Sequence, residues 1–258
     1  MSESGYIFSN AWELAERRLE ALEQEHDPTT KRRALVTGLQ SGWRCLDVGA
    51  GRGSIVRWLS DVVGSSGHVS AVDIDTRFLH ELSRSNVEVH RLDVVNDALP
   101  IAQFDFVHTR LLLMYLPARN EVLQKLVSAL RPGGWILCEE HDIFPIIGAA
   151  TGIYKDAWLS FARGMVAAGV NPTWVRTLPS SLEQLGLLNI MTDVRVPFFR
   201  GGSHEAQFWK LTWMQSKDKV VASGASRDVI DSALVLFDDP TVWLHGPAMV
   251  GVSAQAQG

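Results

Sequence analysis

The feature that most constrains the fold is a glycine-rich segment that directly follows a short apolar run. The run covers residues 43–48, and glycines follow it at positions 49, 51 and 53, ahead of an amphipathic stretch at 55–63. Glycine lets a loop turn tightly and lets a ligand approach the backbone closely. The dinucleotide spacing G-x-G-x-x-G is absent, because Ser54 stands where its last glycine would be.

Apolar and helical segments alternate around this loop. The expected strands cover residues 43–48, 68–72, 87–91, 104–107 and 135–139, and the clearest helix between them covers 118–130. Strands that alternate with helices at this spacing predict βαβ units with right-handed crossovers. The expected fold class is therefore α/β, with a doubly wound, Rossmann-like and mostly parallel sheet.

The flanking segments are predicted from the same periodicities. An N-terminal helix is expected to end at Asp27-Pro28, because a proline disfavours helical backbone in the residue before it. We expect further helices near 154–168, 179–185, 204–221 and 227–236. Strands are expected near 190–198 and 242–245, the second resuming at 249–253, and we interpret them as two edge strands. The tail after Val252 is expected to fray.

The charge balance argues against a nucleic-acid partner. Lys and Arg number 24 against 29 Asp and Glu, for a net charge of −5, whereas proteins that hold a polyanion carry the opposite balance. The longest uncharged stretch, 143–154, is too short to cross a membrane, and no leader peptide is expected. Cys45 and Cys138 lie in apolar runs without metal-ligand spacing, as in a reduced cytoplasmic protein.

Three aspartates follow successive predicted strands. Asp47 precedes the glycine loop, where it can face an ammonium group. Asp73 closes the second strand, twenty residues after Gly53, where an acid accepts hydrogen bonds from ribose hydroxyls. Asp93 closes the third, where it can accept a bond from an adenine amino group while the Val94 amide contributes a donor. A single such aspartate is more often a turn or capping residue, but three in register indicate a nucleoside site.

Five blocks together resemble the class I S-adenosylmethionine-dependent methyltransferases, in their small-molecule, natural-product branch. The blocks are residues 46–53, 72–75, 92–94, 104–110 and the Leu-Arg-Pro-Gly-Gly turn at 130–134, and the resemblance covers about residues 43–142. It implies a seven-stranded sheet with an antiparallel last strand and S-adenosyl-L-methionine as the cofactor. The residues it implies for binding that cofactor are Asp47, Gly49, Gly51, Gly53, Asp73, Ile74, Asp93, Val94, Thr109 and Arg110.

The expected organisation follows from this resemblance. We expect one domain over residues 1–258, made of an N-terminal helical lid (1–30), a cofactor-binding core (31–142), and cap helices with edge strands (143–258). Tyr6 is expected either to close over the cofactor or to lie in a disordered end.

The catalytic groups are expected beyond the fourth and fifth strands, where the sequence has His108-Thr109-Arg110 and Glu139-Glu140-His141-Asp142. A histidine there can accept the proton of a hydroxyl acceptor. His141 is the stronger candidate, because it is expected to follow its strand among acids that could orient it. His108 is the second candidate, and a satisfied structural histidine is its alternative interpretation. The acids could instead hold a substrate cation, and no metal site is expected.

The acceptor is expected to be a small molecule. The chain has nine tryptophans, and Trp158, Trp174, Trp209 and Trp213 lie in the expected cap. We expect them to serve as core residues or as walls for an aromatic or apolar acceptor. After the fourth strand the chain lacks the Asn/Asp-Pro-Pro-aromatic motif used for amino methylation of nucleobases and some protein side chains, which together with the acidic charge favours a small-molecule acceptor. The expected target atom is a hydroxyl oxygen. Secondary metabolism is the expected setting, with a homodimer as one possible assembly. The alternatives are other chemistry with the bound cofactor, such as a cyclisation, and a non-catalytic binding subunit.

Overall fold

The structure is a computed structural model that describes residues 8–80 and 82–258, so Tyr6 lies outside the described residues. The chain divides into two compact units. The helical unit comprises residues up to His26 together with His141–Val175 and Val194–Met249. The sheet unit comprises Asp27–Glu140, Arg176–Asp193 and Val250–Gly258.

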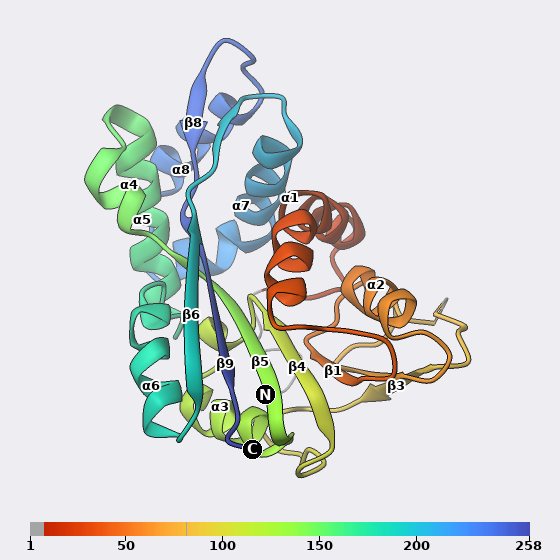
Figure 1. Cartoon of the computed structure of the whole chain (residues 1–258). Helices are drawn as coiled ribbons and strands as arrows, with labels where there is room; N and C mark the ends of the chain where they lie inside the picture. Colours follow the sequence, from red (N-terminus) through yellow and green to blue (C-terminus); the bar gives the residue numbers. More distant parts are fainter. Residues whose placement is uncertain (1–7, 81) are drawn as a thin grey trace. The chain divides into compact units, whose positions relative to one another are not determined.

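A seven-stranded sheet organises the sheet unit (Figure 1). Its order is β3-β2-β1-β4-β5-β9-β6, and its strands are β1 (Arg44–Val48), β2 (His68–Asp73), β3 (Val87–Arg91), β4 (Phe104–Arg110), β5 (Leu130–Asp142), β6 (Leu188–Arg195) and β9 (Ala248–Gln255). Strand β1 pairs in parallel with both β2 and β4, so the strand order reverses next to the glycine loop. This reversal is the switch point at which such sheets bind ligands.

The last strand is antiparallel to its neighbour, as the sequence predicts. The end of β9 meets the start of β5: the Gly133 amide donates to Gln257 O (3.2 Å), and the Ala256 amide donates to Gly134 O (2.8 Å). The seven-stranded Rossmann-like sheet is therefore confirmed.

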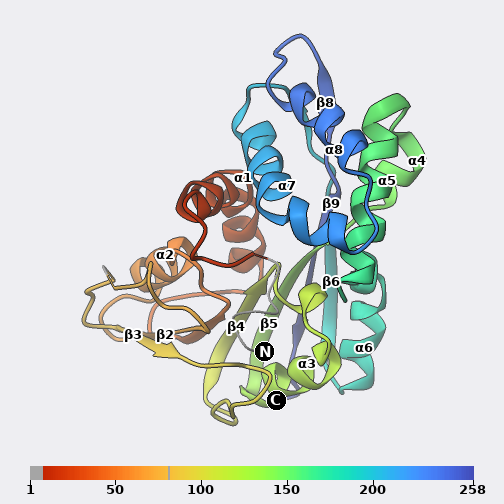
Figure 2. The ribbon, with the colours of Figure 1, turned by 180° about the vertical axis from the view of Figure 1, so that it is seen from behind.

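The core of the sheet unit forms because apolar stripes on the helices meet nearly continuous apolar strands. Helix α2 (Ser54–Val63) buries Ile55, Val56, Leu59 and Val63 in a cluster that also holds side chains of β1 and β2. Helix α3 (Arg119–Ser128) buries Val122, Leu123 and Leu126. Figure 2 shows the far side of the ribbon, with α2 and α3 labelled. Burial of each large aliphatic side chain stabilises the fold by roughly 1.5–3 kcal/mol.

The helical unit is built around aromatic side chains. Its elements are α4 (Phe144–Ala149), α5 (Gly152–Ala167), α7 (His204–Ala222), α8 (Arg227–Leu234) and η3 (Val235–Phe237), with a two-stranded sheet of β7 (Phe198–Arg200) and β8 (Trp243–His245). Trp158 contacts Trp209 and Trp213 edge-on, with ring centroids 4.9 and 5.0 Å apart. Trp158, Trp174, Trp209 and Trp213 are all buried, whereas Trp243 of β8 is 61% exposed.

The prediction that the N-terminal helix ends at Asp27-Pro28 is wrong. Helix α1 runs from Ala15 to Val36 with Pro28 inside it. A proline inside a helix removes one backbone hydrogen bond and costs about 3 kcal/mol. Side chains of the next turns, including Thr30 and Arg33, make buried hydrogen bonds with the sheet, which offset that cost.

The fourth and fifth strands extend further than predicted. Strand β4 includes His108-Thr109-Arg110, and β5 reaches Asp142, so His141 lies inside a strand and does not follow it. The Leu-Arg-Pro-Gly-Gly segment is not a separate turn but the irregular start of β5. Phe104 pairs with Leu130 and Phe106 with Trp135, so extra residues of β5 bulge out between these pairs.

The C-terminal strands also differ from the prediction. Strand β9 lies between β5 and β6, so it is not an edge strand, and β7 and β8 form a separate sheet. The tail does not fray at Val252, because β9 continues to Gln255 with Ser253 and Ala254 buried. The remaining elements are η1 (Leu113–Tyr115), η2 (Trp174–Thr177) and α6 (Leu178–Gln184).

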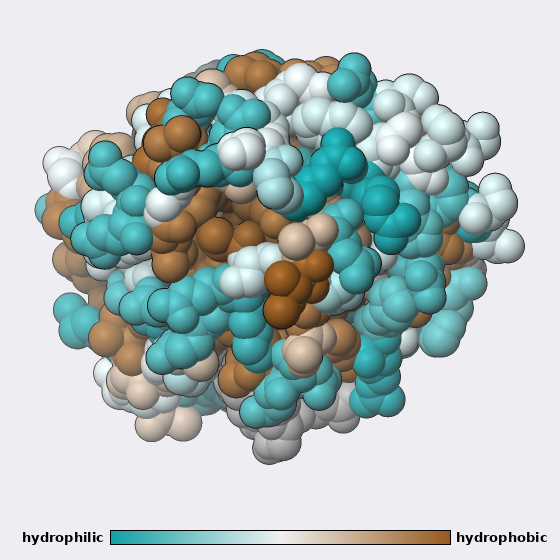
Figure 3. Space-filling view, turned by 60° about the horizontal axis from the view of Figure 1, so that its bottom comes forward, coloured by the Kyte–Doolittle hydropathy of each residue, from teal (hydrophilic) through white to brown (hydrophobic). Residues whose placement is uncertain are grey.

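Hydrophilic residues cover much of the face drawn in Figure 3, with hydrophobic residues exposed between them. No helix within residues 8–80 and 82–258 is long and apolar enough to cross a membrane.

Candidate active site

The glycine loop connects β1 to α2 in the sheet unit. Gly49, Gly51 and Gly53 have φ angles of 80°, 57° and 78°, which side chains other than glycine rarely adopt. The amides of Gly49 and Ala50 both donate to Val72 O, at 2.8 and 3.2 Å, and so join the loop to β2. A Cβ at Gly53 would stand 2.5 Å from a methyl of Leu82, so packing also requires glycine there. The loop conformation therefore depends on the glycines themselves.

Asp73 lies against this loop at the end of β2. Its Oδ2 accepts the Gly51 amide at 2.9 Å, and its Oδ1 accepts the Asp75 amide at 3.0 Å. Burial raises the pKa of Asp73 to about 6, although these two hydrogen bonds oppose the shift. Each carboxylate oxygen can accept a second hydrogen bond, so Asp73 retains the capacity to bind a diol.

Asp93 lies at the end of the neighbouring strand and closes a turn. The Leu92 amide donates to Asp73 O at 2.9 Å, which brings the two strand ends side by side. The carboxylate of Asp93 accepts the Val95 amide (3.0 Å) and the Asn96 side-chain amide (2.8 Å). Val94 is buried, and the Ile74 carbonyl accepts a hydrogen bond from Arg91 (3.1 Å). The four cofactor residues predicted on β2 and β3 therefore share one edge of the sheet.

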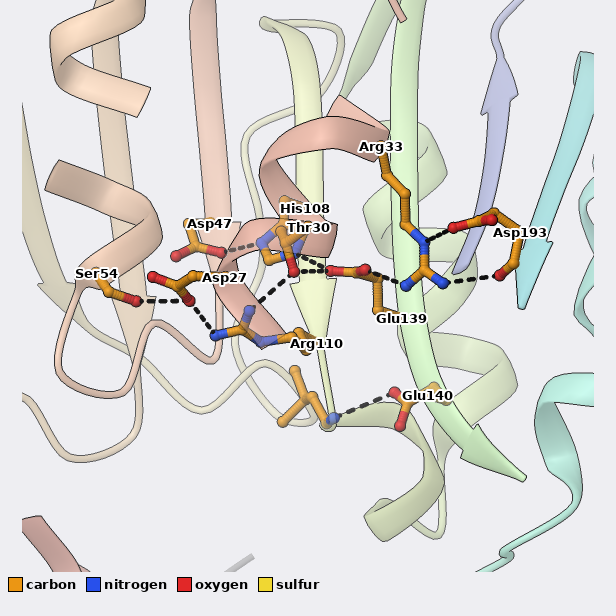
Figure 4. A network of polar contacts seen from close by, with 11 residues as sticks. Asp27, Thr30, Arg33, Asp47, Ser54, His108, Arg110, Glu139, Glu140 and Asp193 are labelled. Carbon is orange, nitrogen blue, oxygen red and sulfur yellow. Dashed lines mark hydrogen bonds and ion pairs between the residues drawn. The ribbon is translucent and has the colours of Figure 1, made fainter. Parts of the chain in front are cut away.

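A buried polar network occupies one face of β1, β4 and β5 (Figure 4). His108 stands at its centre: Nδ1 lies 2.6 Å from Asp47 Oδ1, and Nε2 lies 3.2 Å from Glu139 Oε2. Glu139 also accepts Thr30 Oγ1 at 2.5 Å and Arg33 at 2.6 Å. Asp47, which the sequence predicts to face an ammonium group, is hydrogen-bonded to this histidine.

Helix α1 supplies a large part of the network. Arg110 donates to Thr30 Oγ1 (2.8 Å) and to Asp27 Oδ1 (3.0 Å), and Ser54 donates to the same Asp27 oxygen (3.1 Å). Arg33 also binds Asp193 of β6. Asp27, Thr30 and Arg33 were not predicted from the sequence as partners of this network. The signal available was a helical spacing of three residues among them, which the expected helix end at Asp27-Pro28 concealed.

The charges of this network are mutually stabilised. Burial alone would lower the pKa of His108, but Asp47 and Glu139 outweigh it and raise that pKa to about 9. Burial would raise the pKa of Glu139, but His108, Arg110 and Arg33 lower it to about 2. A histidine that already carries its proton at neutral pH does not accept another, so this geometry favours the structural interpretation of His108 over the catalytic one.

His141 lies in the helical unit, among aromatic rings. Its ring centroid is 5.0 Å from that of Trp209 and 5.4 Å from that of His26, and all three residues are buried. Phe208 contacts His26 at 5.5 Å. The sequence analysis did not single out His26, because the periodicity of the helix carries no sign of what its side chain meets.

The acids around His141 do not gather as a cluster. Glu139 belongs to the polar network, Glu140 binds backbone amides elsewhere in the sheet unit, and Asp142 accepts the Phe144 amide at 2.8 Å. Among the residues that the structure describes, no group of three His, Cys, Asp or Glu side chains is arranged to hold a metal ion.

Comparison with known proteins identifies the class. Residues 45–134 match the methyltransferase domain family. The chain is 29% identical over 144 residues to methyltransferase str2 of Strobilurus tenacellus, a match that covers 54% of this chain and 51% of that protein. The chain spans about half the length of the curated relatives it matches.

Two solved structures share the fold. Phosphoethanolamine N-methyltransferase 2 of Haemonchus contortus, in complex with S-adenosylhomocysteine, has a TM-score of 0.56 at 16% identity over 94% of this chain and 53% of that one. The [4+2]-cyclase SpnF has a TM-score of 0.55 at 17% identity over 90% of this chain and 80% of that one.

The glycine loop and the switch point beside it lie within the segment that matches the methyltransferase domain family. Within this chain, residues 45–134 belong to the methyltransferase domain family.

Proposed function

We propose that the protein transfers the methyl group of S-adenosylmethionine to a small acceptor. The observation that carries the proposal is the hydrogen bond between the Gly51 amide and Asp73 at the switch point of the sheet. The hydrogen bond holds a carboxylate with free acceptor capacity beside Gly51, whose lack of a side chain lets a ligand approach the backbone. The cofactor would supply a methyl group already activated by a sulfonium, and the chain would bind and orient it.

The residues present fit a nucleoside cofactor. We propose that Asp73 accepts hydrogen bonds from the ribose hydroxyls and that Gly49, Gly51 and Gly53 shape the loop around the amino-acid portion. Asp93, Ile74 and Val94 are proposed for the adenine portion, since their strand ends adjoin Asp73. Asp47, Thr109 and Arg110 lie at the adjoining ends of β1 and β4. Asp47 and Arg110 also belong to the polar network, so we propose that they act on the cofactor site from there.

We propose an aromatic or apolar acceptor that is methylated at a hydroxyl oxygen. The aromatic side chains of the helical unit support this proposal, because such rings suit planar, lipophilic ligands. In the transfer, the acceptor oxygen forms a bond to the methyl carbon, the carbon–sulfur bond breaks, and S-adenosylhomocysteine leaves. The hydroxyl proton must go to a base, for which we propose His141.

Two experiments test the function. Calorimetry should show that the folded protein binds S-adenosylhomocysteine, and incubation with methyl-labelled S-adenosylmethionine and a panel of phenolic and aliphatic alcohols should yield labelled ethers. A protein that binds neither form of the cofactor would refute the proposal.

The role of His141 is tested separately. His141→Ala is expected to lower kcat by roughly 10²–10⁴-fold and to flatten the pH dependence near neutrality, with cofactor affinity unchanged. The variant His26→Ala is the matched comparison, because His26 is another buried histidine of the same ring cluster. Full activity in the His141 variant would exclude it as the base.

A second candidate function is a rearrangement such as a cyclisation, with the cofactor bound but not consumed. The [4+2]-cyclase SpnF has the same fold, so the fold alone does not separate the two functions. In the labelling experiment, an altered product without label would identify this second function, whereas cofactor binding without any product would indicate a binding subunit.

We propose that the protein works in the cytoplasm, in secondary metabolism. Both cysteines are free and buried, as expected in a reducing compartment.

A further inference from the structure

Glu140 is a fully buried carboxyl group that the cofactor chemistry leaves unused. Its Oε1 accepts the amide of Leu113 at 2.7 Å and that of Leu112 at 3.1 Å. Figure 4 labels the Glu140 side chain. Its Oε2 has no hydrogen-bond partner among the described residues and is also buried. A buried carboxyl that serves backbone amides fixes the position of the segment that carries them.

That segment follows β4 and has an unusual backbone. Leu111 has a φ of 52°, a left-handed conformation that costs a branched residue about 1 kcal/mol or more. Its amide donates to Glu139 O at 2.8 Å, and the next two amides donate to Glu140. These three hydrogen bonds from consecutive residues hold the chain in the strained turn that begins η1.

The turn brings Leu112 to the glycine loop. A Cβ placed on Gly49 would lie 3.4 Å from Leu112 Cδ2 and 3.6 Å from two further carbons of the same side chain. Leu112 therefore packs directly over the first glycine of the loop. Its position depends on the backbone that Glu140 holds.

We propose that Glu140 is a positioning residue for the cofactor loop, which it supports through the amides of Leu112 and Leu113 and the contact of Leu112 with Gly49. This inference rests on the proposed function, since it assigns the loop to the cofactor. Glu140 acts through Leu112 and is not assigned a contact with the methyl donor or acceptor.

The protonation state of Glu140 shows which substitution preserves its hydrogen bonds and which removes them. Burial raises its pKa to about 8, against the opposing hydrogen bonds from the backbone amides. The group is therefore predominantly a neutral carboxylic acid at pH 7, and glutamine copies both its shape and its acceptor oxygen. Glu140→Gln should preserve the turn, whereas Glu140→Ala should release it.

The test measures S-adenosylhomocysteine affinity by calorimetry alongside thermal unfolding, for the full chain and its variants. Glu140→Ala is expected to weaken binding by about tenfold or more, because a small displacement of a positioning group is costly. Glu140→Gln should stay within about threefold of the wild type on the same argument. The matched control is Asp105→Asn: Asp105 is another buried acid that binds a backbone amide, that of Arg44, at the opposite end of the same strands. The Asp105→Asn variant should be less stable than the wild type and should bind S-adenosylhomocysteine with unchanged affinity.

The outcomes separate the two proposals. A wild-type protein that does not bind S-adenosylhomocysteine refutes the proposed function and this inference with it. A wild type that binds, with Glu140→Ala binding equally well, overturns only the inference. Should Glu140→Ala fail to fold, Leu112→Ala tests the same contact: reduced affinity in a folded variant supports the inference, and unchanged affinity overturns it.

Discussion

The two faces of strands β4 and β5 in the sheet unit differ in whether their buried polar groups have partners. On one face, His108 and Glu139 belong to a network in which each buried charge has a partner of opposite sign. On the other face, Thr109 Oγ1 and Glu140 Oε2 have no hydrogen-bond partner among the described residues. Because side chains alternate along a strand, neighbouring residues are sorted between these environments.

The adjacent residues Glu139 and Glu140 show what this difference does. Both side chains are fully buried, and burial raises the pKa of each. The cationic partners of Glu139 reverse the effect and bring its pKa to about 2. The backbone amides that donate to Glu140 do not outweigh its burial, and its pKa is raised to about 8. The partners, not the depth of burial, decide the charge.

The largest expected effect comes from breaking the paired face. Glu139→Ala leaves His108 and Arg33 buried without their shared counter-charge, and loss of one partner of a buried pair costs about 3–5 kcal/mol. Urea unfolding at pH 7 should report this loss in the free energy of unfolding. A loss below about 1 kcal/mol would show that the network contributes no more than an exposed ion pair.

A substitution beside the glycine loop should lower the affinity for S-adenosylhomocysteine. Asp73→Ala removes a charged acceptor proposed for two ribose hydroxyls, each bond worth roughly 1.5–3 kcal/mol, so S-adenosylhomocysteine affinity should fall at least about tenfold. Calorimetry measures the change. The loop also loses the bond from the Gly51 amide, so circular dichroism should first establish that the variant is folded. Unchanged affinity would remove Asp73 from the site.

The pH dependence of stability distinguishes the faces. The pKa of Glu140 is raised from 4.5 to about 8, so its contribution is complete below pH 4.5 and is lost as pH rises through 8. For one proton, this decline in the free energy of unfolding is at most about 1.4 kcal/mol per pH unit, and it should disappear in Glu140→Gln. The pKa of His108 is raised from 6.5 to about 9, so its contribution to stability should be lost between pH 6.5 and pH 9 in the variant as in the wild type. Identical stability curves for variant and wild type would contradict the raised pKa.

The smallest effect is expected at Thr109. Replacing an unpartnered buried hydroxyl with a methyl group of the same shape, as in Thr109→Val, should be neutral or stabilising by up to about 1 kcal/mol in the unliganded protein. Thermal unfolding without and with S-adenosylhomocysteine gives the comparison. If the ligand uses this hydroxyl, the ligand-induced rise in Tm will be smaller in the variant than in the wild type.

The alternating apolar segments and the glycines are local patterns, so the sequence by itself determined the parallel strands of the sheet and its switch point. The three strand-end aspartates predict a ligand site at the carboxyl ends of these strands. The sequence also predicted the helices of the second half closely, for example residues 154–168 against Gly152–Ala167. These features follow from the periodicity of hydrophobic residues and from the conformational freedom of glycine, and both are properties of a short segment of sequence.

Only the tertiary structure decided where α1 ends, how far β4 and β5 run, and which buried groups are charged. Helix α1 continues past Pro28 because Thr30 and Arg33 meet Glu139, a residue more than one hundred positions away. Asp47 and Glu139 from two other strands enclose His108 and raise its pKa to about 9, whereas burial raises the pKa of Glu140 to about 8. Electrostatic energy depends on distance in space, which the order of residues along the chain does not encode locally.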